Sequence, residues 1–127
     1  MRLLLDTTVL IDVLCSRKGR RELLAEVVRA GHALTTTTLN IAELYAGIRP
    51  GEETKTEAVL QSLESFDVTG ATARLAGMLK NTWARRGRTL ALVDMIVAAT
   101  AIEHDCMLVT DNRKDFPMQE LRLYPLP

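Results

Sequence analysis

The chain opens on a short, continuously apolar run that ends on an aspartate, in "LLLDTTVLID" (residues 3–12). A run of this length without alternation is typical of a strand buried on both faces of a parallel sheet. Similar short runs, or runs rich in β-branched residues, recur along the chain. Together they predict strands at Arg2–Leu5, Ala33–Thr37, Phe66–Thr69, Met107–Thr110 and Leu121–Tyr124.

Between these strands the apolar residues recur every three or four positions, as they do on one face of a helix. The spacing predicts helices at Thr8–Leu14, Glu22–Ala30, Asn40–Ile48, Glu53–Glu64, Thr72–Arg86 and Val93–His104. Strands alternating with helices indicate an α/β layered domain with a small, mostly parallel central sheet. Because 127 residues suffice for one core but not for two, we expect a single domain over residues 1–127.

Composition narrows the class of protein. Sixteen basic and sixteen acidic residues give no net charge, which excludes a generally basic nucleic-acid-binding surface but leaves room for local patches. No apolar run approaches the roughly 18 residues that cross a bilayer. Cys15 and Cys106 form neither a metal-type pair nor a disulfide framework. We therefore expect a protein of the reducing cytoplasm, with no membrane partner.

Acidic residues occupy unusual places in this pattern. Asp6 ends the first strand, and Asp111 and Asp115 follow the strand at residues 107–110. Glu43 and Asp94 lie inside apolar helical stretches, "NIAELYAG" and "LALVDMIVAATA". An isolated buried carboxylate is expensive unless it is paired, protonated or bound to a metal. Since ligands of such folds bind beyond the carboxyl ends of the strands, we expect these acids to converge on that edge of the sheet.

Each acid also has a purely structural explanation. Asp6 could cap the helix that follows it, and Glu43 stands three residues after Asn40, which is the spacing of a capping box. Asp94 could cap its own helix, and Asp111 could form a turn. The combination of these acids favours a catalytic or metal-binding site over separate structural roles, because few basic residues stand beside them in the sequence.

A cluster of oxygen ligands without a nearby histidine or cysteine suits Mg²⁺ or Mn²⁺ better than zinc. Such ions activate a water and stabilise the leaving oxygen in phosphodiester hydrolysis. Thr8 and Thr110 are placed to hold carboxylates through hydroxyl hydrogen bonds, although ordinary turn and cap bonding explains both threonines equally well.

Four segments, in this order, resemble the PIN domain family and in particular the VapC toxins of toxin–antitoxin pairs: "LLLDTTVLIDVL", "TLNIAELYAG", "LVDMIVAATAIEH" and "LVTDNRKDF". The resemblance spans residues 3–116. It implies a PIN-like α/β/α sandwich and a Mg²⁺- or Mn²⁺-dependent endoribonuclease. It further implies a VapB-type antitoxin, toxin homodimers and toxin–antitoxin hetero-oligomers.

The resemblance also assigns site residues. It places metal-binding acids at Asp6, Glu43 and Asp94, although "DMIVAA" carries a valine that the family pattern lacks. The fourth acid falls in "TDNRKDF", where Asp115 matches better than the extra acid Asp111. Asn112 occupies a position that is aspartate in some relatives. Asp111 and Asn112 are thus expected beside the metal site or the RNA.

Basic residues offer places for an RNA partner, in clusters at residues 17–21, 85–88 and 113–114. Solvation of the surface explains more than half of them, and we favour Arg88, just upstream of Asp94, as a phosphate contact. The stretches Leu39–Ile48 and Glu53–Leu63 hold more apolar residues than one packed face needs. We therefore expect the antitoxin to bind in an apolar groove beside them.

Other readings are weaker. A dehalogenase-like phosphatase needs a second aspartate where Thr8 stands. A receiver domain needs a lysine directly after a late strand, and here no lysine follows such a strand before Lys114. A non-catalytic module whose acids bind a basic peptide stays open, and loss of RNA cleavage on chelation separates it from an enzyme. The sequence leaves open which RNA is cut, how many ions bind, and the identity of the antitoxin.

Overall fold

The computed structural model describes residues 1–127, and its five strands form one sheet in the order β3-β2-β1-β4-β5. All four strand pairings are parallel, which confirms the predicted sheet. The strands are β1 (Arg2–Leu5), β2 (Ala33–Thr37), β3 (Glu64–Phe66), β4 (Met107–Val109) and β5 (Arg122–Leu123).

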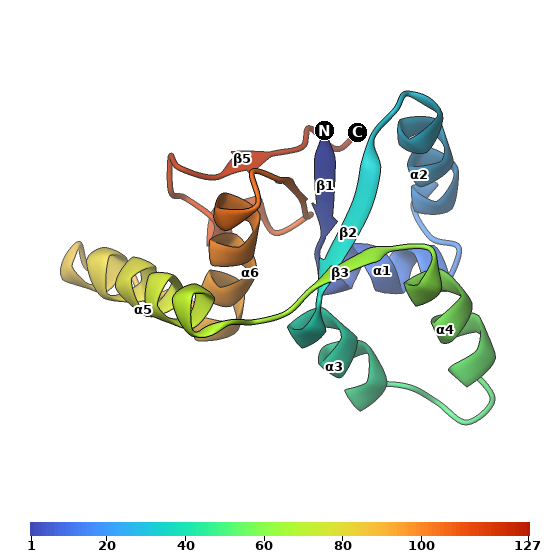
Figure 1. Cartoon of the computed structure of the whole chain (residues 1–127), viewed down its shortest axis with the longest axis horizontal. Coiled ribbons are helices and arrows are strands. Elements are labelled where there is room, and N and C mark those ends of the chain that lie inside the picture. The colour runs from blue at the N-terminus through green and yellow to red at the C-terminus, as the bar shows by residue number, and fades with distance from the viewer.

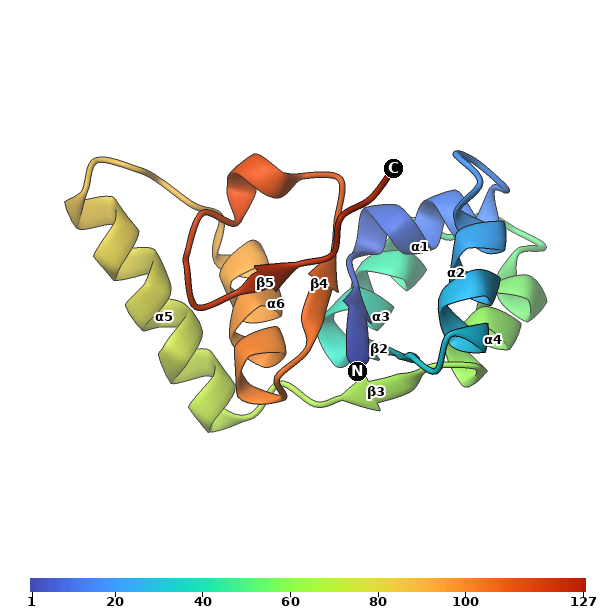
Figure 2. The ribbon, with the colours of Figure 1, turned by 90° about the horizontal axis from the view of Figure 1, so that it is seen from above.

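Helices cover both faces of this sheet. They are α1 (Thr7–Leu14), α2 (Arg20–Arg29), α3 (Thr38–Ala46), α4 (Glu53–Gln61), α5 (Gly70–Arg85) and α6 (Leu92–Glu103), with a short 3₁₀ helix η1 (Arg113–Asp115). Figures 1 and 2 show α5 and α6 on one side of the sheet, and α1, α2 and α4 on the other. The predicted α/β/α sandwich is confirmed.

The continuous apolar run of β1 follows from this arrangement. Successive side chains of a strand point to opposite faces, so a strand covered on both sides needs an apolar residue at every position. Leu4 packs into the cluster that includes α5 and α6, whereas Leu3 and Leu5 pack into the cluster that includes α1 and α2. All three leucines are buried.

Most elements begin or end within one to three residues of the prediction, and two of these differences bear on the site. We expected β3 at Phe66–Thr69, but it ends at Phe66, which pairs with Thr37 at the end of β2. Helix α3 begins at Thr38 rather than Asn40, because the Thr37 side chain accepts a hydrogen bond from the Asn40 N–H at 3.1 Å and so caps the helix. This earlier start leaves Glu43 inside the helix and removes the capping-box explanation for that residue.

The carboxyl ends of β1 and β4 lie next to each other. Leu5 is paired with Val109, and the Asp6 N–H donates to the Val109 carbonyl at 3.1 Å. The chain leaves β1 toward β2 on one side and returns as β4 on the other, so strand order reverses here, which is where α/β sheets bind ligands. No helix of the chain is both long and apolar enough to cross a membrane.

Candidate active site

Asp6 occupies this reversal point and has two structural contacts. One carboxylate oxygen accepts from the Thr7 N–H at 2.9 Å and caps α1, and the other accepts from the Thr110 hydroxyl at 2.8 Å. Burial is the main cause that raises the pKa of Asp6. The two hydrogen bonds oppose that effect, and the charges of Glu43 and Asp115 add to it. Capping and chemistry are therefore not alternatives for Asp6, which is placed for both.

Of the two threonines expected to hold carboxylates, only Thr110 does so at Asp6. Thr8 is exposed and makes no hydrogen bond to Asp6, because the second position of α1 points its side chain to solvent. The neighbouring Thr7 has the role instead, through its backbone N–H on Asp6 and its hydroxyl on Glu43. The prediction for Thr8 was wrong by one residue.

Glu43 projects from α3 and is held by a chain of polar groups. The Thr7 hydroxyl donates to Glu43 at 2.8 Å, and the Asn40 side-chain amide donates to the Thr7 hydroxyl, also at 2.8 Å. The buried Asn40 in turn accepts from the Thr37 hydroxyl at 2.6 Å. This series of hydrogen bonds ties α1 to α3 and fixes the position of the Glu43 side chain. Sequence reasoning missed these roles of Thr7, Thr37 and Asn40, although Thr7 and Asn40 belong to the segments quoted above and Thr37 ends the strand predicted at Ala33–Thr37.

Asp94 lies in the first turn of α6, and Ala91 rather than Asp94 is the N-cap of that helix. The structural explanation offered for Asp94 is therefore wrong. Its pKa is raised to about 6, first by burial and then by the charges of Asp6, Asp115 and Glu43. Asp115 ends η1, and its charge raises the pKa of both Asp6 and Asp94.

These four residues form what we call the acid cluster: Asp6, Glu43, Asp94 and Asp115. The chain has five ion pairs, and no member of the acid cluster takes part in any of them. As the side chains stand, no three His, Cys, Asp or Glu residues are arranged closely enough to hold a metal ion. The cluster thus brings negative charges together without a cation and without a closed ligand shell.

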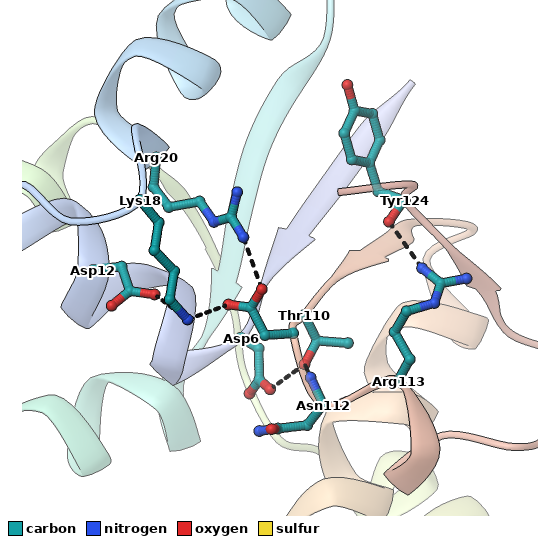
Figure 3. A network of polar contacts seen from close by, with 9 residues as sticks. Asp6, Asp12, Lys18, Arg20, Thr110, Asn112, Arg113 and Tyr124 are labelled. Atoms are coloured by element: carbon teal, nitrogen blue, oxygen red, sulfur yellow. Dashed lines mark hydrogen bonds and ion pairs between the residues drawn. The ribbon is translucent and has the colours of Figure 1, made fainter. Parts of the chain in front are cut away.

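Asp111 belongs to a different group. The Arg20 guanidinium pairs with it at 2.7 Å, and the Lys18 ammonium lies 3.6 Å from it. Lys18 also lies 3.6 Å from Asp12, and Figure 3 shows this pair beside Arg20. We call Asp12, Lys18, Arg20 and Asp111 the ion-paired group. Its cations neutralise Asp111, which was expected beside the metal or the RNA. Arg20 is 4% exposed, and its Nε has no hydrogen-bond partner.

Lys18 lies in the loop between α1 and α2, and Arg20 is the first residue of α2. Ser16 and Lys18 have φ angles of 53° and 56°, and Gly19 has 65°, all in the left-handed region. That conformation costs a residue other than glycine on the order of 1 kcal/mol. The ion pairs of Lys18 and Arg20 with Asp111 offset this strain and hold the loop against the turn after β4.

The remaining predicted residues lie around that turn. The Asn112 N–H donates to the Thr110 hydroxyl at 3.0 Å, so Asn112 supports Thr110 through its backbone rather than its side chain. Arg88 is exposed and donates to the Lys114 carbonyl, next to Asp115. Arg88 therefore lies near the acid cluster while its guanidinium contacts the backbone.

Two hollows flank α1. The first, which we call the Glu43 pocket, has a volume of about 230 Å³ and is lined from α1, α3 and α4, with Glu43 in its wall. The second, which we call the α2–α4 groove, has a volume of about 490 Å³ and is almost entirely apolar. Its wall includes Leu24, Val28, Leu34, Val59 and Leu63.

The α/β/α sandwich, with Asp6 at its switch point, has the architecture of the PIN domain family. The model of that family matches residues 3–118, and the chain belongs to it.

Similar proteins include Ribonuclease VapC19 of Mycobacterium tuberculosis, 36% identical over 115 residues that cover 91% of this chain and 92% of the relative. Ribonuclease VapC10 of the same organism is 32% identical over 118 residues, covering 93% and 88%.

Solved structures share the fold. VapBC2 from Rickettsia felis, bound to a DNA fragment from its promoter, has a TM-score of 0.86 at 23% identity and covers 98% of both chains. VapBC-1 from nontypeable Haemophilus influenzae has a TM-score of 0.82 at 23% identity, covering 98% of this chain and 97% of that one.

Proposed function

We propose that the chain is a Mg²⁺- or Mn²⁺-dependent endoribonuclease that acts as the toxin of a VapBC-type toxin–antitoxin pair, folded as one domain over residues 1–127. The curated relatives named above are ribonucleases, and the chain spans about nine-tenths of each. The observation that carries the proposal is the acid cluster, whose four carboxylates lack any cation of the protein.

The chemistry of the donor set fits a hard divalent ion. Asp6, Glu43, Asp94 and Asp115 supply only carboxylate oxygens, which Mg²⁺ and Mn²⁺ prefer, and no histidine or cysteine belongs to the cluster. These four residues would hold the ion. When bound, it would supply an activated water and stabilise the charge that develops on phosphate oxygens.

The residues around the cluster position its carboxylates. Thr110 and the Thr7 N–H hold the two oxygens of Asp6, so this carboxylate has a fixed orientation before any ligand arrives. The hydroxyl of Thr7 holds one oxygen of Glu43, and the Asn40 amide fixes that hydroxyl by donating to it. Preorganised groups cost no rearrangement when substrate charge develops, which is how such contacts support catalysis.

Asp94, like Asp115 and unlike Asp6 and Glu43, receives no hydrogen bond from a protein group on its carboxylate. Its pKa of about 6 means that it holds a proton more readily than an ordinary aspartate does. A bound cation would displace that proton and return the carboxylate to its charged form. Binding of metal should therefore release a proton from Asp94 near pH 6 and below.

The proposed partner is a VapB-type antitoxin. We expected its groove beside the stretches Leu39–Ile48 and Glu53–Leu63. The α2–α4 groove draws on α2 and, within the second stretch, on Val59 and Leu63, whereas residues within 43–48 of the first stretch line the Glu43 pocket. The groove leaves Val28 50% exposed, and an amphipathic helix of the antitoxin would cover it. Homodimers, hetero-oligomers with the antitoxin and a cytoplasmic location belong to the same proposal.

The test is cleavage of total cellular RNA by the purified chain, with the ends of the products sequenced. We expect cleavage with Mn²⁺ or Mg²⁺, none with EDTA, and recovery when the ion is restored. If no RNA is cut under any of these ions, the acids serve only to bind a basic partner and the enzyme is ruled out. Failure to bind the product of the adjacent small gene would remove the toxin role alone.

A further inference from the structure

The Glu43 pocket lies beside the acid cluster and has no role in the proposed function so far. Glu43 belongs to both, because it forms part of the pocket wall and its carboxylate faces the Thr7 hydroxyl. A ligand in the pocket would therefore touch the group that lies next to the reacting phosphate.

The wall of the pocket has two kinds of surface. Ile11, Leu14, Leu44 and Ile48 give it an apolar part, and Ile11 is 40% exposed. The polar part contains three cations, Arg17, Arg49 and Lys55.

None of these cations takes part in an ion pair of the chain. Glu52, the other acid in the wall, accepts a hydrogen bond from the Arg49 N–H at 2.8 Å. The pocket thus combines an apolar surface with unpaired positive charge.

We propose that this pocket holds one nucleotide of a single-stranded RNA, directly next to the scissile phosphate. This inference rests on the proposed function. The faces of an unstacked base are apolar and suit the Ile11–Ile48 side of the pocket. The phosphates on either side of that base suit Arg17, Arg49 and Lys55, which take part in no ion pair of the chain.

A protein segment fits the pocket less well than it fits the α2–α4 groove. The groove is about twice as large and its wall is mostly apolar, which suits the apolar face of a helix. The Glu43 pocket is smaller, and burying its three cations under an apolar side chain would be costly. The two hollows share α1 and α4, so RNA and antitoxin would lie on adjacent surfaces.

Gly47 offers a way to fill the pocket without disturbing the fold. It lines the pocket and caps the end of α3 with φ −104°, a conformation open to any residue. A Cβ added to Gly47 meets no atom within 4 Å. Gly47→Phe should therefore place a ring over the pocket, and Gly77→Phe on α5 is the matched control, because a Cβ there also meets nothing within 4 Å.

The experiment first locates the cut sequence in total cellular RNA and then uses a short synthetic RNA of that sequence. We expect Gly47→Phe to bind Mn²⁺ as the wild type does, by calorimetry, and to lose at least about tenfold in kcat/KM. Gly77→Phe should match the wild type in both. Replacing the base next to the scissile phosphate by an abasic site should impair the wild type but leave Gly47→Phe almost unchanged, since that variant has already lost the contact.

A second variant keeps the inference testable if Gly47→Phe folds poorly. The double variant Arg49→Gln with Lys55→Gln should bind Mn²⁺ normally and show a salt dependence of RNA binding shallower by about one to two in the log–log slope. Arg29→Gln, at the exposed end of α2, is its control.

Normal kcat/KM in the pocket variants would overturn the inference, as would normal cleavage with loss of antitoxin binding, which would make the occupant a protein. If the wild type cuts no RNA, the proposed function itself fails and takes the inference with it.

Discussion

The acid cluster and the ion-paired group lie at the same edge of the sheet, and both contain an acid from the segment after β4. Asp111 and Asp115 are four residues apart, and the sequence alone does not decide which of the two belongs to the acid cluster. What separates them is the segment that enters α2, because Lys18 of the α1–α2 loop and Arg20 at the start of α2 reach Asp111 and leave Asp115 without a partner. An acid that the protein neutralises contributes to the fold, whereas acids crowded together without a cation need one from outside.

The largest effect expected from this difference is at Asp94. Asp94→Asn keeps the size of the side chain and removes the charge, so RNA cleavage should fall on the order of a thousandfold or more. Without metal the variant should unfold at higher temperature than the wild type, because repulsion within the acid cluster is relieved, and Mn²⁺ should reduce that advantage.

Cleavage across a Mn²⁺ titration, together with thermal unfolding in EDTA, checks this prediction. Asp67→Asn, at an exposed position outside every ion pair, is the control. Full activity of Asp94→Asn would mean that Asp94 has a structural role in α6 and none in catalysis.

The opposite outcome is expected at Asp111. Asp111→Asn leaves the buried Arg20 guanidinium without its closest counter-charge, which should lower the free energy of unfolding by about 2 kcal/mol. Mn²⁺ affinity should change little. Urea denaturation measures the loss, and Asp105→Asn is the control, since it breaks an exposed pair with Arg122 and should cost under about 1 kcal/mol. A catalytic loss at Asp111 as deep as at Asp94, without a loss of stability, would refute the comparison.

A smaller effect is expected at Thr110, which holds Asp6 without belonging to the acid cluster. Thr110→Val keeps the shape and removes the hydroxyl, so Mn²⁺ affinity should fall about 10- to 100-fold. Thr110→Ser, which retains the hydroxyl, should stay close to the wild type. Calorimetric Mn²⁺ titrations of the three proteins decide between orientation of Asp6 and simple packing.

The smallest effect is a pH dependence of stability in EDTA. The pKa of Asp94 is raised in the folded chain, so its favourable contribution is complete below its ordinary pKa of 3.8 and is lost as pH rises through about 6. The difference in unfolding free energy between wild type and Asp94→Asn should therefore grow with pH across this window. It should be on the order of 1 kcal/mol, because Asp94 is only partly shielded from water. A constant difference would show that Asp94 titrates normally.

Much of the fold was predictable because one rule governs it. Strands covered on both faces are apolar at every position, so β1 and β4 stand out from the sequence. β2 stands out by its β-branched threonines, and the helices follow from the spacing of their apolar residues. The position of β3 was not predictable. Only Phe66 among its residues is buried, so no apolar pattern marks the strand, and pairing with β2 decides where it ends.

For the site, the acids could be found and their partners could not. Asp6 and Asp94 stand out because carboxylates are rare in such apolar surroundings. The Asp111 pairing joins residues 91 positions apart, and nothing local signals it. The same holds for Asn40, which reaches Thr7 across 33 positions and has no charge to draw attention to it.

Asp6 both begins α1 and stands in the acid cluster, and this double use has a consequence for inactive relatives. Exchanging one carboxylate oxygen for an amide gives asparagine, which still accepts the Thr7 N–H as a helix cap. A single substitution can thus silence the chain while leaving its shape and its partner surface intact. A gene carrying Asp6→Asn would encode a folded decoy able to take antitoxin away from active copies, so survival of a cell holding both would depend on their relative abundance.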